Sequence, residues 1–162
     1  MGFESKEENN KLKILVDAII RSGKRGIIQG FSQSLQTYQL PDNIINIGSV
    51  PHEWLFPQAF CIIHHGGLST TATVFKAGVP AIVIPHVLDQ YIWANKAYQL
   101  QTGAKPVKPK DLNQEVLMDR IEYISNNYDE IEKHTRKISQ LINKEQGLKN
   151  AIDLIGEVKS GS

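Results

Sequence analysis

The stretch of this 162-residue chain best suited to chemistry is FCIIHHGGLSTT, at positions 60–71. An apolar run gives way there to two histidines, two glycines and hydroxyl groups: His64, His65, Gly66, Gly67, Ser69 and Thr70. The first turn of a helix offers unpaired N–H groups and the positive end of the helix dipole, which attract phosphate. The sequence therefore predicts an anion site at this turn. An ordinary glycine turn with a Ser/Thr helix cap would use the same residues.

A second polar pair follows the apolar run AIVI at positions 81–84. Asp89 and Gln90 stand at the expected start of the next helix, where a carboxylate and an amide can bind vicinal hydroxyls of a sugar. Helix capping by Asp89 is the alternative, because Asp is among the preferred N-cap residues.

Other kinds of site find less support. His64, His65 and nearby Cys61 suggest a metal, but adjacent strand residues point to opposite faces, so both imidazoles do not easily reach one ion. No metal site is expected, and Cys61 is predicted to be a small core residue. The chain has no Walker-type loop and no G-x-G-x-x-G after a strand, and no nucleophile–base pair stands out. The isolated histidines, expected on the surface or in turns, are His52, His86 and His134.

Composition limits the class of protein. Hydrophobic residues make up 41% of the chain, enough for the core of one domain, and 18 basic against 17 acidic residues leave a net charge of +1. This balance gives no reason to expect nucleic acid or an anionic membrane as a partner. One cysteine excludes an intramolecular disulfide framework, and the apolar runs are far shorter than the roughly 20 residues of a membrane span. We expect a soluble, intracellular single domain.

Strand-like and helix-like segments alternate along the chain and should position these residues. Apolar runs predict strands at 25–29, 44–47, 59–64, 81–84 and 104–107, and helical spacing predicts helices at 6–21, 69–77, 90–101, after Asp111, and within 129–155. Asp111 and Gln114 predict a capping box for the fourth of these helices. The alternation favours an α/β, Rossmann-like three-layer domain with a mostly parallel sheet and a binding crevice at the carboxyl ends of its strands. Because the chain starts almost directly in a helix, we expect the first strand of this fold to be missing or truncated.

Segment 50–94, VPHEWLFPQAFCIIHHGGLSTTATVFKAGVPAIVIPHVLDQYIWA, resembles the donor-binding signature of nucleotide-sugar glycosyltransferases of the GT-B fold. VPH, LFP, HHGG, AGVP and DQ occur in the order found in sterol and lipid glucosyltransferases and in the related antibiotic glycosyltransferases. More weakly, the whole chain, 1–162, resembles the C-terminal, donor-binding half of such an enzyme. The resemblance implies that the N-terminal acceptor-binding domain and its catalytic histidine base are absent from this chain, which supplies no catalytic residue and should be inactive alone.

The resemblance also implies roles for individual residues. The implied ligands of the donor diphosphate are His65, Gly66, Gly67, Ser69, Thr70 and Ser5. The sugar hydroxyls would be held by Asp89 and Gln90. The nucleobase and ribose would meet Ser49, Val50 and His52.

Three positions depart from the family pattern. Glu4 replaces the second glycine of a Gly-Phe-Gly-Ser loop, of which Gly2-Phe3-Glu4-Ser5 is a remnant that retains Ser5. Ser49 stands near the place of the base-stacking Trp of plant enzymes, and Thr73 replaces their ribose-binding Glu. The expectation that the donor base is uridine therefore rests only on the family members that this chain resembles most.

The resemblance implies the donor domain of an inverting glycosyltransferase that transfers a hexose, glucose from UDP-glucose, to a lipophilic hydroxyl acceptor such as a sterol. Neither a metal nor a cofactor is expected, because the helix dipole, His65 and the hydroxyls would stabilise the departing diphosphate. Two alternatives stay open: the donor-binding subunit of a split enzyme with a membrane-attached partner, and one half of a nucleotide-sugar epimerase. A cytoplasmic location is expected, with peripheral attachment of the full-length protein to a membrane left open.

Overall fold

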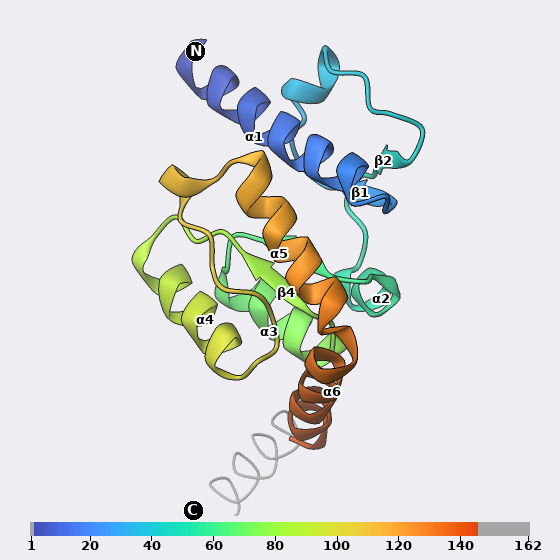
Figure 1. Ribbon diagram of the computed structural model, residues 1–162, viewed down its shortest axis with the longest axis vertical. Coiled ribbons are helices and arrows are strands. Elements are labelled where there is room, and N and C mark those ends of the chain that lie inside the picture. Colours follow the sequence, from blue (N-terminus) through green and yellow to red (C-terminus); the bar gives the residue numbers. More distant parts are fainter. Residues whose placement is uncertain (1, 146–162) are drawn as a thin grey trace, which may run out of the picture.

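The computed structural model describes residues 2–145, in which short strands alternate with helices (Figure 1). In chain order the elements are α1 (Gly2–Arg21), β1 (Gly26–Ile28), η1 (Ser34–Gln36), β2 (Ile44–Asn46), α2 (His52–Leu55), η2 (Phe56–Gln58), β3 (Ile62–His64), α3 (Leu68–Ala77), β4 (Ala81–Val83), α4 (Leu88–Gln99), η3 (Pro109–Asp111), α5 (Gln114–Asn126) and α6 (Tyr128–Lys144), where η marks a 3-10 helix. The predicted α/β class is confirmed. Of the helix predicted within 129–155, the part beyond residue 145 lies outside the described residues.

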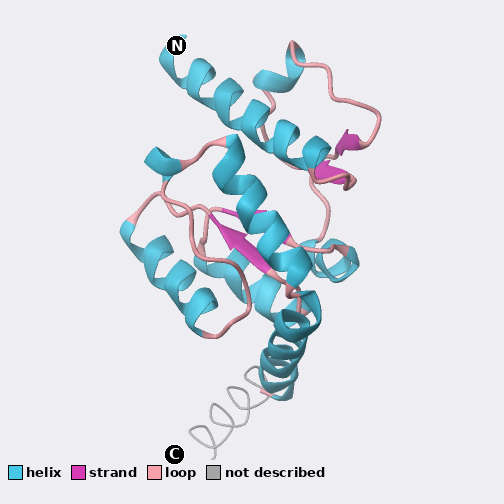
Figure 2. Ribbon diagram, viewed as in Figure 1, coloured by secondary structure: helices cyan, strands magenta, loops and turns pink. Residues whose placement is uncertain are grey.

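The four strands form two parallel pairs (Figure 2). β1 pairs with β2 in a register that places Ile27 opposite Ile45, and β3 pairs with β4 so that His64 lies opposite Val83. The predicted parallel arrangement is correct. The described residues, however, form two separate two-stranded sheets instead of one continuous sheet, and each strand is only three residues long.

The strand predicted at 104–107 is not formed. Gly103 makes an isolated parallel bridge with Ala81, and the Ala104 N–H donates to the carbonyl oxygen of Ala81 at 3.0 Å. The next N–H of a regular ladder would belong to position 106, which is a proline and has none. The N–H of Val107 donates to Val83 instead, also at 3.0 Å. The segment therefore follows β4 without becoming a strand.

The predicted cap of α5 is also wrong. Asn113 is the N-cap, and its side-chain oxygen accepts a hydrogen bond from the Val116 N–H at 2.9 Å. Asp111 instead closes the 3-10 turn η3, and its N–H donates to the carbonyl oxygen of Lys108 at 2.9 Å. Pro109 favours this turn because its ring fixes φ near the helical value. The turn draws Asp111 away from the position from which it could cap α5.

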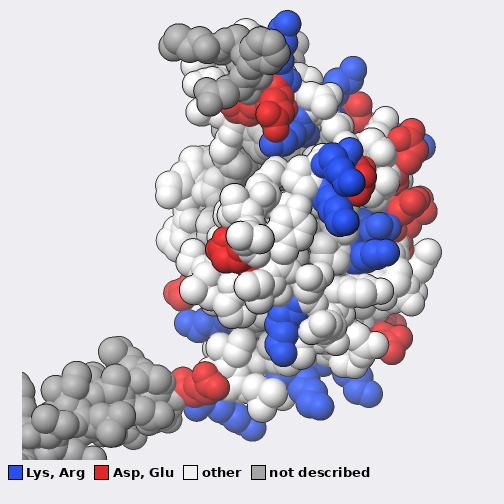
Figure 3. Space-filling view, turned by 90° about the vertical axis from the view of Figure 1, so that its left-hand side faces the viewer, with Lys and Arg blue, Asp and Glu red and all other residues white. Residues whose placement is uncertain are grey.

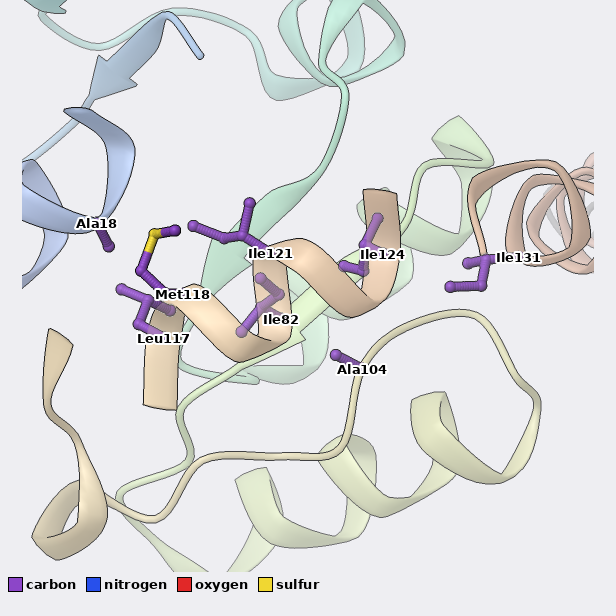
Figure 4. Close-up of a cluster of buried hydrophobic side chains, with 8 residues drawn as sticks. All are labelled: Ala18, Ile82, Ala104, Leu117, Met118, Ile121, Ile124 and Ile131. Atoms are coloured by element: carbon purple, nitrogen blue, oxygen red, sulfur yellow. The ribbon is translucent and has the colours of Figure 1, made fainter. Parts of the chain in front are cut away.

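Helices cover both faces of β4. Ile82 points into a cluster formed mainly by α1, α5 and α6, which includes Ala18, Ile82, Ala104, Leu117, Met118, Ile121, Ile124 and Ile131 (Figure 4). Ala81 and Val83, on the opposite face, pack in a second cluster with Val74 of α3 and Ala94 of α4. This alternation is the period of two expected of a strand. The β3–β4 pair is thus the middle of the three layers that the sequence predicts.

Helix α1 contributes to two of the hydrophobic clusters. Its Leu12 and Val16 are buried with Ile28 of β1 and Ile44 of β2, while Ala18 belongs to the cluster around β4. Within residues 2–145, no helix combines the length and the apolar character that crossing a bilayer requires.

Candidate functional site

The polar residues that follow β3 and β4 meet at the carboxyl ends of these two strands. The Ile84 N–H donates to the carbonyl oxygen of His64 at 2.9 Å, so the chain leaves both strands side by side. A Cβ atom placed on Gly66 would lie 3.1 Å from the carbonyl oxygen of Gln90 and closer still to Val83. Gly66 also has φ of +88°, which favours glycine. The glycine turn therefore packs directly against the first turn of α4.

Helix α3 begins at this edge without a side-chain cap. Gly67 is its N-cap, and the first intrahelical hydrogen bond runs from the Thr71 N–H to the Gly67 carbonyl oxygen at 2.9 Å. The N–H groups of Leu68, Ser69 and Thr70 precede that bond and are the orphan donors of the helix start. The simple alternative, a Ser or Thr capping side chain, is therefore not what the structure forms. The arrangement leaves backbone donors and the positive end of the dipole available to an anion.

The two neighbouring histidines lie in different environments, as strand alternation predicts. His65 is exposed, and its Nε2 would lie 2.6 Å from a Cβ placed on Gly67, so the imidazole covers the start of α3. His64 is turned inward, and its Nδ1 accepts a hydrogen bond from the Gly66 N–H at 3.1 Å. Burial, with a smaller effect of the His65 charge, lowers the pKa of His64 to about 4. His64 is thus a neutral residue that shapes the turn, and His65 is the imidazole that can meet a ligand.

Asp89 and Gln90 lie in the first turn of α4, beside the glycine turn. The side-chain oxygen of Gln90 accepts hydrogen bonds from the N–H groups of His86 at 2.7 Å and Val87 at 3.3 Å. This contact leaves the amide NH₂ of Gln90 as the group that can donate to a ligand. Asp89 is exposed and is not the N-cap, which is Val87. The capping alternative for Asp89 is therefore wrong.

The predicted nucleoside residues follow β2 and lead into α2. Ser49 is exposed and Val50 is half-buried. His52 has its Nε2 2.7 Å from Gln29 Oε1, and its ring stacks on Phe56 with 4.5 Å between the centroids. These contacts tie the segment to the end of β1 and to η2.

The short helix α2 packs against α3 beside this segment. Lys76 Nζ lies 3.2 Å from Glu53 Oε1, and the two helices border a shallow pocket of about 200 Å³. Its lining residues are Glu53, Pro57, Thr73, Lys76 and Ala77. The structure thus joins the predicted diphosphate and sugar residues at one edge and places the nucleoside residues beside α2.

Ser5 does not lie in a loop. It falls within α1, which begins at Gly2, so the predicted remnant of a glycine loop is wrong. The following residues KEENNKLK are mostly compatible with a helix, and their helical propensity extends α1 through this segment. The backbone of Ser5 therefore lacks the loop conformation that the resemblance implies.

His86, expected on the surface or in a turn, is exposed at this edge. His86 follows β4, and besides burial the charges of Lys11 and His65 lower its pKa, while Glu7 acts in the opposite direction. Lys11 comes from α1, where its Nζ lies 2.7 Å from Glu7 Oε1.

Cys61 packs against the core, and burial raises the pKa of its thiol to about 12, as expected of a core residue. Within the described part of the chain, no three His, Cys, Asp or Glu side chains gather as a metal site would require.

Several apolar side chains are exposed next to the site. The exposed apolar side chains at the starts of α3 and α4 are Leu68, Val87, Leu88 and Ile92. Figure 3 views the molecule from the side of α4 and shows broad uncharged areas on that face.

Residues 15–144 match the family described as erythromycin biosynthesis protein CIII-like, C-terminal domain. The chain belongs to this family. The match covers most of the chain, including every predicted site residue except Ser5. The resemblance to the C-terminal domain of GT-B glycosyltransferases is therefore confirmed.

The similar curated proteins are sterol 3-beta-glucosyltransferases. UGT80B1 of Arabidopsis thaliana is 30% identical over 94% of this chain, and the Pichia angusta enzyme is 37% identical over 87%. The chain spans only 25% and 12% of these two proteins. This EryCIII-like domain is thus a glycosyltransferase C-terminal domain related to the sterol glucosyltransferases.

Solved structures agree with the fold. The glycosyltransferase VinC in complex with DTDP superposes with a TM-score of 0.82 at 21% identity, covering 100% of this chain and 41% of VinC. The calicheamicin glycosyltransferase CalG4 gives 0.80 at 19% identity, covering 92% of this chain and 38% of CalG4. The EryCIII-like domain therefore has the fold of the C-terminal domain of a GT-B glycosyltransferase.

Proposed function

We propose that this chain is the donor-binding domain of an inverting glycosyltransferase that transfers glucose from UDP-glucose to a lipophilic hydroxyl acceptor such as a sterol. The observation that carries the proposal is the meeting of two kinds of polar group at the carboxyl ends of β3 and β4. Phosphate donors at the start of α3 lie beside Asp89 and Gln90 at the start of α4. A site for a nucleotide sugar needs donors for the diphosphate and partners for the sugar hydroxyls next to each other.

The proposed contacts follow the order of groups along the donor. His65 and the α3 start, with the hydroxyls of Ser69 and Thr70, bind the diphosphate. Asp89 accepts hydrogen bonds from sugar hydroxyls, and the Gln90 NH₂ group donates to a sugar oxygen. The nucleoside lies toward the segment 49–52 beside α2.

In the proposed reaction, a base in the acceptor domain removes the proton of the acceptor hydroxyl. The resulting oxygen attacks the anomeric carbon from the face opposite the diphosphate, and the bond to the diphosphate oxygen breaks with its electron pair. The α3 dipole and His65 stabilise the negative charge that develops on the leaving group. We therefore propose that the reaction requires neither a metal ion nor a cofactor.

Two observations support a lipophilic acceptor. The relatives are named sterol 3-beta-glucosyltransferases, and Leu88, a large apolar side chain with 88% of its surface exposed, begins α4 next to the proposed sugar position. An apolar surface beside the sugar suits either the acceptor itself or the domain that holds it. The catalytic base and most acceptor contacts belong to that domain, and we place the enzyme in the cytoplasm.

Calorimetric titration of the 162-residue chain with UDP-glucose, UDP and dTDP tests this function. We expect binding of both uridine nucleotides, weaker binding of dTDP, and the same affinities with and without magnesium. Binding that needs magnesium would contradict the metal-independent diphosphate site. A preference for dTDP would contradict the proposed donor, and absence of binding to all three would contradict a donor site within this chain.

A further inference from the structure

The side chain of Gln29 connects the carboxyl ends of β1 and β2. Gln29 directly follows β1, and its Nε2 donates to the carbonyl oxygen of Gly48 at 3.0 Å. Its Oε1 lies 2.7 Å from Nε2 of His52. Gly48 follows β2, and His52 begins α2. One amide group therefore makes two contacts with the segment beside which the nucleoside of the donor is proposed to lie.

The orientation of the Gln29 amide follows from its two partners. The carbonyl oxygen of Gly48 can only accept, so the NH₂ group of Gln29 faces Gly48 and its oxygen faces His52. The amide oxygen can only accept as well, so Nε2 of His52 carries a proton. In the neutral imidazole the acceptor is then Nδ1. Gln29 thus selects the tautomer of His52.

The half-buried ring of His52 is also held at its face. It stacks on Phe56, with 4.5 Å between the centroids and 13° between the ring planes. Phe56 is buried in the cluster that includes Val74 of α3 and Val83 of β4. Gln29 therefore holds the ring at Nε2 while Phe56 holds it from the side of the core. Nδ1 is the ring nitrogen that neither contact uses.

We propose that Gln29 is a positioning residue for the nucleoside of the donor, because it holds His52 with Nδ1 as the acceptor and fixes the backbone at Gly48. This inference rests on the proposed function and adds the end of β1 to the elements that form the donor site. A nucleoside offers O–H and N–H groups, which an acceptor nitrogen can bind. Gln29 lies outside segment 50–94, which carries the family signature.

Titrations of UDP and inorganic diphosphate into variants of the full chain test this role. Gln29→Met nearly keeps the length of the side chain and removes both hydrogen bonds. We expect it to weaken UDP binding about three- to tenfold, the range for the loss of a neutral hydrogen bond. The affinity for inorganic diphosphate should stay unchanged, because that ligand occupies only the site at the start of α3. Gln33→Met, which alters an exposed glutamine four residues later, is the matched control and should bind UDP normally.

Nitrogen-15 NMR of the His52 ring gives a readout that a general structural role of Gln29 would not change. At about pH 8, where histidine is neutral, His52 of the unaltered chain should be the Nε2–H tautomer. In Gln29→Met both tautomers should be populated. The double variant Gln29→Met/His52→Ala should bind UDP little more weakly than His52→Ala alone, because Gln29 acts through His52.

The outcomes separate this inference from the proposed function. UDP binding by the unaltered chain, with equal affinity in Gln29→Met, would overturn the role of Gln29 and leave the donor site intact. An Nδ1–H tautomer of His52 in the unaltered chain would overturn it too. Equal losses for UDP and inorganic diphosphate would have the same meaning, because they indicate a general effect on the structure. If the unaltered chain does not bind UDP, both the inference and the donor site fail.

Discussion

His64 and His65 are neighbours in the chain with opposite surroundings, because successive strand residues point to opposite faces. His65 lies over Gly67 at the start of α3, while His64 accepts the Gly66 N–H through Nδ1. The proton of the neutral His64 ring must then be on Nε2, which is buried and has no hydrogen-bond partner within residues 2–145. One histidine therefore shapes the turn and the other faces the ligand.

Burial of His64 should make the stability of the protein depend on pH. Its pKa is about 4 in the folded chain against 6.5 when exposed, so between these values the unfolded state binds more protons. The free energy of unfolding should fall as the pH drops from 6.5 to 4, by up to about 3 kcal/mol from this residue. Urea unfolding at several pH values should show this dependence, and His64→Gln should lack that share of it. The same pH dependence in both proteins would contradict the assignment.

Asp89 should distinguish the sugar from the nucleotide. Because its exposed carboxylate is proposed to bind sugar hydroxyls, Asp89→Ala should weaken UDP-glucose binding about tenfold, while UDP binding stays nearly unchanged. Calorimetry with both ligands measures the difference directly, and UDP is the internal control. Equal losses for the two ligands would count against a contact with the sugar.

Among the helices, the start of α5 allows a direct test of which residue, Asn113 or Asp111, is its N-cap. Asn113→Ala removes the hydrogen bond from the Val116 N–H and should lower the free energy of unfolding by about 1 kcal/mol. Asp111→Ala, two residues earlier in η3, should change it much less. Urea denaturation of both variants measures the two effects, and a larger effect at Asp111 would show that the predicted capping box forms after all.

The central elements could be predicted because local patterns determine them. The apolar runs at 59–64 and 81–84 contain β3 and β4, and the observed starts of α3 and α4 lie within two residues of the predicted ones. The failures arise where one residue overrides a pattern. Pro106 interrupts a ladder that the apolar run 104–107 would otherwise continue, and Pro109 draws Asp111 into η3.

The candidate site was only partly predictable for a different reason. The signature between positions 60 and 90 brings its residues together through two neighbouring strands, so sequence order alone predicts their meeting. Ser5, by contrast, is expected in a loop and lies in α1. The position of α1 depends on the packing of Leu12 and Val16 with Ile28 and Ile44, which no local pattern specifies.

Across the whole molecule, α1 contributes to the hydrophobic clusters around both strand pairs. Its buried face joins the cluster with Ile28 and Ile44, and Ala18 joins the cluster around Ile82 of β4. Helix α1 therefore belongs to the core on both of these sides.

The central claim is that a nucleoside diphosphate binds where His65 covers the start of α3. The most direct measurement is the calorimetric affinity for UDP of the unaltered chain and of His65→Ala, with thermal unfolding as the check on folding. We expect binding by the unaltered chain and a loss of about 1.5–3 kcal/mol in the variant, the range for a hydrogen bond to a charged group. Unchanged UDP affinity in a folded His65→Ala variant would remove His65 from the site and contradict diphosphate binding at the start of α3.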